Sequence, residues 1–195
     1  MIIERTLSIG KSILLGEIDY DLSPQIETDW IDSTTYQQSN ANKTLQSISS
    51  EIVTQSPEVI ETSVEEAKHN FYFTIRFNED NRLLGFVRLN RIDWTRRSGN
   101  IWLLIGNDVD RNRGFGTEAL NLILKFAFSY LNLYHLNAWV RENNMIAFHF
   151  LEKAGFREEV RHQQTLNITG KSSDYLQMGL QKQDWFQLTK LVEIG

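Results

Sequence analysis

The stretch DRNRGFGTEALNLILKFAF, residues 110–128, combines two glycines with the start of a long apolar helix. Apolar residues recur along it at spacings of three, four and seven, which predicts a helix that buries one face. The first N–H groups of a helix have no partner inside it, and glycines at that end let an anion approach closely. The stretch therefore predicts a pyrophosphate-binding loop formed by Arg111, Asn112, Arg113, Gly114, Phe115, Gly116 and Thr117.

A second interpretation of these residues is a tight strand-to-helix turn that needs glycine and binds nothing. Two nucleotide-binding motifs do not fit the chain. A Walker A loop requires a glycine five positions before its final G-K-[ST], but Arg5 and Thr165 stand there, ahead of the GKS runs at 10–12 and 170–172. The dinucleotide fingerprint requires a third glycine where Ala119 stands.

The rest of the chain predicts an α/β (α+β) fold with a mixed sheet. Two β-rich runs, 71–77 and 83–92, flank a predicted hairpin turn at residues 78–81. Further strands are predicted at 12–18, 100–106, 134–140, 158–166 and 174–180, the last two around a turn at 167–173. Helices are predicted at 21–31, within 33–56, after Ser63, over the quoted stretch, and at 144–156 with Gly155 ending it. Hairpins join the middle strands and helices join the later ones, so the sheet must be mixed.

Length and composition limit the classes of protein to consider. The chain has 195 residues, no cysteine and a formal charge of −5, which predicts one domain over 1–195 without disulfides or a cysteine nucleophile. The charge argues against a nucleic-acid partner, and no apolar run is long enough for a membrane span or a signal peptide. The four histidines have no metal-ligand spacing. We expect a cytoplasmic protein with no metal, no nucleic acid and no membrane partner.

Two motifs at the expected separation resemble a known family. Arg111-x-x-Gly114-x-Gly116 is similar to the acyl-CoA signature [R/Q]-x-x-G-x-[G/A] of the GCN5-related N-acetyltransferase (GNAT) superfamily. Asn144-x-x-Ala147, followed by LEKAGF at 151–156, resembles its later helix. The likeness is greatest to the ribosomal-protein N-acetyltransferase (RimJ/RimL-like) branch and covers roughly residues 10–185. It implies a single mixed, mostly antiparallel central sheet with a splayed parallel pair and flanking helices.

The resemblance also implies a site and a reaction. The pantetheine arm of acetyl-CoA inserts between the two splayed strands in this superfamily, and an amine attacks the acetyl thioester directly. Carried over by position, the backbone of Leu103, Leu104 and Ile105 binds that arm, residues 111–117 hold the pyrophosphate, and Asn144 reaches the pantetheine or thioester. We expect acetyl-CoA as the co-substrate.

The chain departs from the family at two catalytic positions. Leu151 stands where many relatives have a tyrosine acid, and Asn100 stands where several have a glutamate on the strand before the loop. Asparagine can orient a water or an amine but is not a base at neutral pH. The catalytic candidates are therefore Asn100, Glu142 and His135, with His149, Tyr134, Tyr175 and Asp93 as further substitutes. Each of these substitutes also has a plain structural interpretation as a surface, packing or turn-capping residue, and Trp30 and Trp94 either line an acceptor cleft or pack.

Three functions remain open at this point. The first is an acetyl-CoA-dependent N-acetyltransferase that acts on a primary amine, either an amine-bearing small molecule such as a polyamine, amino acid or antibiotic, or a peptide N-terminus. The second, motivated by Leu151 and Asn100, is a catalytically silent acyl-CoA-binding module. The third, a nucleotide-dependent kinase, is disfavoured by the failed Walker spacing. The chain is expected to be a monomer or a homodimer.

Overall fold

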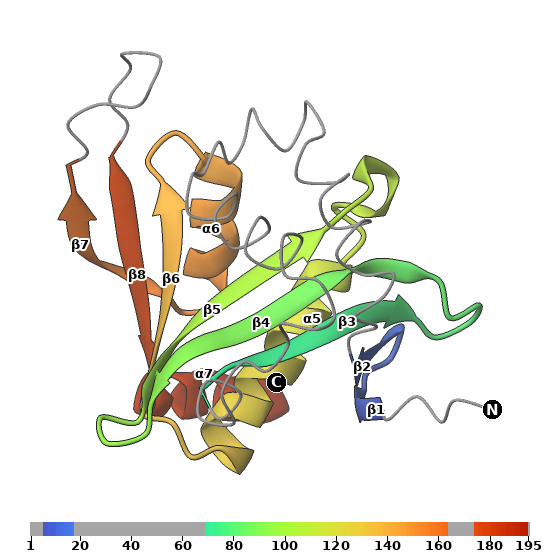
Figure 1. Cartoon of the computed structure of the whole chain (residues 1–195), viewed down its shortest axis with the longest axis horizontal. Helices are drawn as coiled ribbons and strands as arrows, with labels where there is room; N and C mark the ends of the chain where they lie inside the picture. Colours follow the sequence, from blue (N-terminus) through green and yellow to red (C-terminus); the bar gives the residue numbers. More distant parts are fainter. Residues whose placement is uncertain (1–5, 18–68, 164–173, 195) are drawn as a thin grey trace, which may run out of the picture. The chain divides into compact units, whose positions relative to one another are not determined.

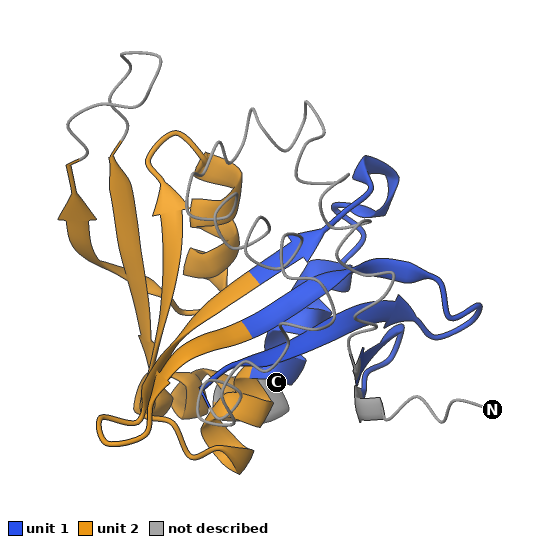
Figure 2. Ribbon diagram, viewed as in Figure 1, with its two compact units in different colours: residues 1–88, 103–123 blue, residues 89–102, 124–195 orange. Residues whose placement is uncertain are grey.

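The computed structural model describes residues 6–17, 69–163 and 174–194. They fall into two compact units (Figure 2). Unit 1 comprises residues 1–88 and 103–123, and unit 2 comprises residues 89–102 and 124–195. The helices predicted at 21–31, within 33–56 and after Ser63, Trp30, and the turn predicted at 167–173 lie outside the described residues.

The sheet has the strand order β1-β2-β3-β4-β5-β6-β8-β7 (Figure 1). Its strands are β1 (Thr6–Ile9), β2 (Ile13–Glu17), β3 (Phe71–Phe77), β4 (Leu83–Asp93), β5 (Ser98–Ile105), β6 (His135–Arg141), β7 (Arg157–His162) and β8 (Tyr175–Gln181). The described helices are the 3-10 turn η2 (Asp108–Asp110), α5 (Phe115–Lys125), the π-helical turn η3 (Phe126–Tyr130), α6 (Met145–Lys153) and α7 (Lys182–Ile194).

Unit 1 contains the antiparallel pairs β1–β2 and β2–β3 together with α5. Its core joins apolar strand residues to the inner face of α5: Ile13, Leu15, Ile75, Leu84, Phe86, Val87, Ala119, Leu120 and Ile123. The predicted hairpin turn after β3 is confirmed, because Phe77 N donates to the Arg82 carbonyl at 3.0 Å. Asn81 supplies the left-handed conformation that this turn needs, with a φ of 59°.

Unit 2 contains the parallel pair, which confirms the mixed sheet predicted from the sequence. β5 pairs with β6 only over Ser98–Asn100 and His135–Asn137. Beyond Asn100 and Asn137 that ladder stops, although β6 continues to Arg141 and pairs with β8 along its whole length. On one face of β6 every second residue, 136, 138 and 140, is buried, and the residues between them are half-buried or exposed. The second face therefore carries the polar side chains of His135, Asn137 and Arg141 together with the exposed Trp139.

The end of α6 confirms the predicted role of Gly155. Its φ is +95°, and Phe156 N donates to the Leu151 carbonyl while Gly155 N donates to the Glu152 carbonyl. These bonds satisfy the last carbonyls of the helix as in a Schellman motif. A Cβ at Gly155 would also collide with the Leu188 side chain of α7. Both conformation and space therefore require glycine here.

The structure differs from the sequence-based prediction at both ends. The single strand predicted at 12–18 begins one residue later, and a second strand, β1, precedes it and pairs with it. The helix α7 follows the last predicted strand and was not predicted from the sequence. Trp185 is nevertheless buried, with its ring centroid 5.4 Å from that of Phe128, so packing rather than periodicity stabilises α7.

Candidate active site

β5 leads toward residues 111–117, here called the glycine loop. A close backbone contact with β4 in unit 1 holds the end of β5. Gly106 N donates to the Leu84 carbonyl at 3.0 Å. The Leu104 carbonyl occupies the space that a Cβ at Gly85 would need, so only glycine allows the two backbones to approach this closely. The position of the loop is thus set by β4.

Arg111 binds its own loop. Its guanidinium Nε donates to the Ile105 carbonyl at 3.0 Å and Nη2 to the Gly106 carbonyl at 2.9 Å. Its Nη1 forms an ion pair with the Asp108 Oδ1 at 2.6 Å. Each guanidinium nitrogen of Arg111 therefore has a partner among residues 105–108. The Arg111 side chain stabilises the turn between β5 and η2.

A buried carboxylate holds the other side of the loop. Asp110 is 1% exposed and accepts two hydrogen bonds from the Arg82 guanidinium, at 2.7 and 2.8 Å, while Arg113 Nη1 lies 3.5 Å away. The Arg82 hydrogen bonds hold the pKa of Asp110 below its ordinary value, against the opposing effect of burial. Arg82 follows the β3–β4 turn, so this pair ties the hairpin to the loop.

The start of α5 has no side-chain cap. Asn112 and Gly114 adopt left-handed conformations with φ of 58° and 89°, and the first helical bond runs from Glu118 N to the Gly114 carbonyl at 3.0 Å. Within the described residues the backbone N–H groups of 112–117 have no hydrogen-bond partner. The space in front of Gly114 is open. Several N–H groups at a positive helix end therefore face an unfilled space, which fits an anion.

Packing beneath the loop involves aromatic rings and the β1–β2 turn. The Phe115 ring lies 5.5 Å from that of Phe77, with the Arg113 guanidinium 5.2 Å above it. Ser12 N donates to Glu118 Oε1 at 2.9 Å. The backbone N–H of Ser12, in the GKS run at 10–12, is thus already bound to a side chain of α5. This agrees with the absence of Walker A spacing before that run.

In unit 2, a group of amide side chains lies where the β5–β6 ladder ends. Asn100 and Asn137 are the last pair of the ladder, so both side chains lie on the same face. Gln177 of β8 donates from Nε2 to the Asn137 Oδ1 at 2.8 Å. Asn137 and Gln177 were not singled out from the sequence, since they are 40 positions apart and no spacing pattern links them.

His135 and Glu142, the other catalytic candidates, both have partners of opposite charge. His135 Nε2 lies 2.9 Å from the Glu159 Oε1 of β7, and both side chains are partly exposed. The Glu159 carboxylate occupies the space above Gly179. Glu142 is exposed and forms an ion pair with Arg161, whose pKa is raised chiefly by its hydrogen bond to Glu158. The structure thus gives His135 a carboxylate partner that sequence reasoning missed.

Asn144 caps α6 and is buried. Its Oδ1 accepts from Ala147 N at 3.1 Å, so this oxygen serves the helix. Leu151, at the position of the family's tyrosine, is buried and apolar.

The further catalytic candidates named from the sequence make local contacts that stabilise strands, a helix and a turn. The Tyr175 hydroxyl accepts from Arg141 Nε at 3.1 Å, and the exposed Tyr134 hydroxyl accepts from Arg97 at 3.1 Å. His149 pairs with Glu152 on the exposed side of α6. Asp93 and Trp94 lie at the β4–β5 turn. The Asp93 carboxylate accepts a hydrogen bond from Arg96 N at 2.8 Å, and Trp94 is partly exposed.

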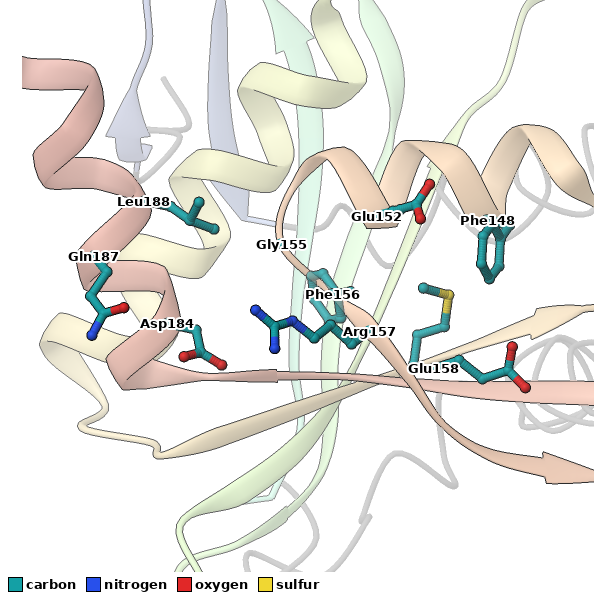
Figure 3. A pocket seen from close by; sticks show the side chains of 10 residues that line it. Phe148, Glu152, Gly155, Phe156, Arg157, Glu158, Asp184, Gln187 and Leu188 are labelled. Atoms are coloured by element: carbon teal, nitrogen blue, oxygen red, sulfur yellow. The ribbon is translucent and has the colours of Figure 1, made fainter. Parts of the chain in front are cut away.

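A cavity of about 520 Å³ lies in unit 2 among α6, α7 and strands β7 and β8 (Figure 3). Its apolar lining includes Phe148, Phe156 and Leu188, and carboxylates reach it from Glu152 and Asp184. None of the residues predicted from the sequence as site residues lines it. The described ranges contain no cluster of three or more metal-ligating side chains and no helix that is long and apolar enough to cross a membrane.

The mixed sheet has one short parallel ladder. The helix start that follows β5 has glycines and no side-chain cap, an arrangement that is typical of anion sites in α/β domains. Residues 20–157 match the family model described as an acetyltransferase (GNAT) domain. The chain therefore belongs to the GNAT acetyltransferase family, whose acyl donor is acetyl-CoA.

Two curated proteins are similar in sequence. YjcK, a probable N-acetyltransferase of Bacillus subtilis (strain 168), is 32% identical over 113 residues, which are 56% of this chain and 61% of that protein. The spermidine N(1)-acetyltransferase of Vibrio cholerae serotype O1 is 30% identical over 96 residues, 49% of this chain and 55% of that protein. The matches thus span little more than half the length of these relatives.

Solved structures share the fold. A spermidine N-acetyltransferase from Vibrio cholerae in complex with CoA and spermine has a TM-score of 0.71 at 18% identity, and covers 91% of this chain and 99% of its own. A proposed ribosomal-protein-serine acetyltransferase from Vibrio cholerae has a TM-score of 0.66 at 19% identity, with coverage of 93% and 99%. These likenesses confirm the predicted GNAT fold.

Proposed function

We propose that this chain transfers an acetyl group from acetyl-CoA to a primary amine. The observation that carries the proposal is the start of α5, where the N–H groups of 112–117 have no partner among the described residues and the space in front of Gly114 is open. Membership of the GNAT family gives this anion site its ligand, the pyrophosphate of acetyl-CoA.

Each unit supplies part of the proposed machinery. In unit 1, residues 111–117 hold the pyrophosphate, with Arg111 shaping the loop, and the backbone of Leu103, Leu104 and Ile105 pairs with the pantetheine arm. In unit 2, Asn144 caps α6 through Oδ1, and the family motif assigns the same residue to the cofactor. These assignments follow the family motif position by position.

Acetyl-CoA supplies the acetyl thioester. In the transfer, a C–N bond forms between the amine and the acetyl carbon, the C–S bond breaks, and the departing thiolate takes a proton from solvent. We assign the proton lost by the ammonium to the His135 imidazole, directly or through a water, because the Glu159 carboxylate contacts Nε2 and so orients the ring. Asn100 orients the amine. Glu142 is less suited as a base, since Arg161 already binds its carboxylate.

A polyamine is the first acceptor to test, and a peptide N-terminus the second. One relative is named for spermidine, and a structural neighbour was solved with spermine. A formal charge of −5 favours a cationic partner by long-range attraction.

Acetyl-CoA at about 100 times its dissociation constant is expected to raise the free energy of unfolding by about 2.7 kcal/mol. Thermal unfolding with and without the ligand measures this, and ATP at the same concentration is the control because the Walker spacing is absent. Release of free CoA thiol is then followed with spermidine, spermine, an amino acid amide and a short peptide. Stabilisation by ATP but not acetyl-CoA would contradict the proposal.

The second candidate is an acyl-CoA-binding module without turnover, favoured by the buried, apolar Leu151 at the tyrosine position. It predicts the same stabilisation by acetyl-CoA but no thiol release with any amine above the rate of spontaneous hydrolysis. The two assays together therefore separate the candidates.

A further inference from the structure

The contact between His135 and Glu159 joins β6 to β7 across the strand that lies between them, β8. All three strands belong to unit 2. His135 Nε2 and Glu159 Oε1 are 2.9 Å apart, and a contact of this length above β8 needs a residue without a side chain beneath it. Gly179 is that residue, because a Cβ there would lie 2.1 Å from the carboxyl carbon and from Oε1 of Glu159.

Strand register brings these three residues together. The Cα partner of His135 in β8 is Gln181, so Gly179, two positions along β8, is its diagonal neighbour on the same face. A long side chain can span the distance between diagonal neighbours. On β7 the register shifts by one residue at Glu159, which is therefore the extra residue of a β-bulge. Bulges redirect a side chain, and here the redirected carboxylate lies above Gly179.

The Glu159 carboxylate determines which ring nitrogen of His135 is free. A neutral imidazole carries one N–H and a carboxylate can only accept, so the hydrogen is on Nε2 and the lone pair is on Nδ1. Nδ1 has no hydrogen-bond partner among the described residues. The His135 side chain is 27% exposed, so a ligand can reach it. Nδ1 is thus the atom of this ring that can accept a proton.

We infer that Gly179 and Glu159 are positioning residues for the base assigned to His135, and that Nδ1 is the atom that takes the proton. The inference rests on the proposed function. In this step an N–H bond of the substrate ammonium breaks, an N–H bond forms at Nδ1, and the imidazolium then returns the proton to solvent. Gly179 touches no reacting atom; its missing side chain leaves the place from which Glu159 holds the ring.

Nitrogen NMR of the histidine rings in isotope-labelled protein tests the arrangement without any cofactor or acceptor. At alkaline pH, where imidazole rings are neutral, the His135 ring should carry its hydrogen on Nε2 alone, and a His135→Gln variant assigns its signals. Gly179→Ala puts a methyl group where the Glu159 carboxylate lies. Because that carboxylate ends a flexible side chain and can move away, this variant should fold, but its His135 ring should populate both N–H forms.

With an amine that supports turnover, Gly179→Ala and Glu159→Leu are each expected to lower kcat about tenfold, part of the roughly 10²–10⁴-fold that general base catalysis supplies. The affinity for acetyl-CoA, measured by calorimetry, should not change. Because the glycine acts through the carboxylate, the double variant should lose no more activity than either single variant. Glu159 is partly exposed, so Glu159→Leu covers the case in which Gly179→Ala folds poorly.

Glu152→Leu is the matched control. Glu152 makes the same kind of contact with another histidine of unit 2, since its Oε2 lies 3.1 Å from His149 Nδ1. This variant loses a histidine–carboxylate contact on the exposed side of α6 and should leave both kcat and the His135 ring signals unchanged.

A His135 ring that carries its hydrogen on Nδ1 in the wild type would overturn the inference. A folded Gly179→Ala protein with unchanged ring signals or unchanged kcat would do the same, as would single losses that multiply in the double variant. A wild-type protein that binds acetyl-CoA but releases no thiol with any amine would instead refute the proposed function, whatever the ring signals show. The two failures are therefore distinct.

Discussion

Gly116→Trp is expected to lower the affinity for acetyl-CoA by at least about 100-fold, because hydrogen bonds to a charged group contribute about 1.5–3 kcal/mol each and several are lost together. Gly116 is the second residue of α5 and half-buried, among N–H groups that have no partner in the described part of the chain. An indole at this position fills the space that a pyrophosphate needs. The Gly116→Trp chain should remain folded, since the side chain is added in the first turn of α5 at a half-buried position outside the apolar core.

Calorimetric titration measures the affinity, and circular dichroism verifies the fold. Thr117→Val is the matched control, since Thr117 is the next residue and exposed, and this change removes a hydroxyl while leaving every backbone N–H in place. We expect it to change the affinity less than about fivefold, the effect of one hydrogen bond. If a folded Gly116→Trp protein bound acetyl-CoA with wild-type affinity, the pyrophosphate would not bind at this loop.

Asp110→Asn is expected to lower the free energy of unfolding at pH 7 by about 2 kcal/mol, within the range for hydrogen bonds to charged groups, because the Arg82 partner is itself 37% exposed. The Asp110 side chain is fully buried, and the two hydrogen bonds from Arg82 join the β3–β4 hairpin to the loop. The asparagine NH₂ faces a guanidinium that can only donate. Urea unfolding at pH 7 measures the difference, with Asp80→Asn as the control, because Asp80 is an exposed partner of the same arginine and should contribute less than about 1 kcal/mol.

The same pair predicts how stability depends on pH. The pKa of Asp110 is lowered in the folded chain, so its carboxylate stays charged at pH values where the unfolded chain is already protonated. The stabilisation is therefore fully present above the ordinary aspartate pKa of about 3.9 and is lost as the pH falls through the lowered value. The difference between wild type and Asp110→Asn should shrink from pH 7 toward acid. A difference that is independent of pH would contradict this account of the pair.

The order of elements around the glycine loop could be predicted from the sequence. Periodicity predicted α5, the turn residues predicted the β3–β4 hairpin, and Gly155 was recognised as the residue that ends α6. Each of these signals depends on the conformational preferences of neighbouring residues. The two motifs of the family were likewise short and local, so the GNAT fold followed from them.

The partners of the site residues were decided by the tertiary structure alone. Arg82 and Asp110 are 28 positions apart, His135 and Glu159 are 24 apart, and Asn137 and Gln177 are 40 apart. No spacing rule predicts such pairs, because they meet only when strand register and the packing of loops bring distant parts of the chain together.

Arg111 illustrates the same limit. Its residue type suggested a phosphate ligand, but its guanidinium is bound to the carbonyls of Ile105 and Gly106. The sequence by itself therefore determined the fold, the glycine loop and the family. The packing of distant strands and loops determined which polar groups are already satisfied and which remain to bind a ligand, because a side chain's hydrogen bonds depend on neighbours that only folding supplies.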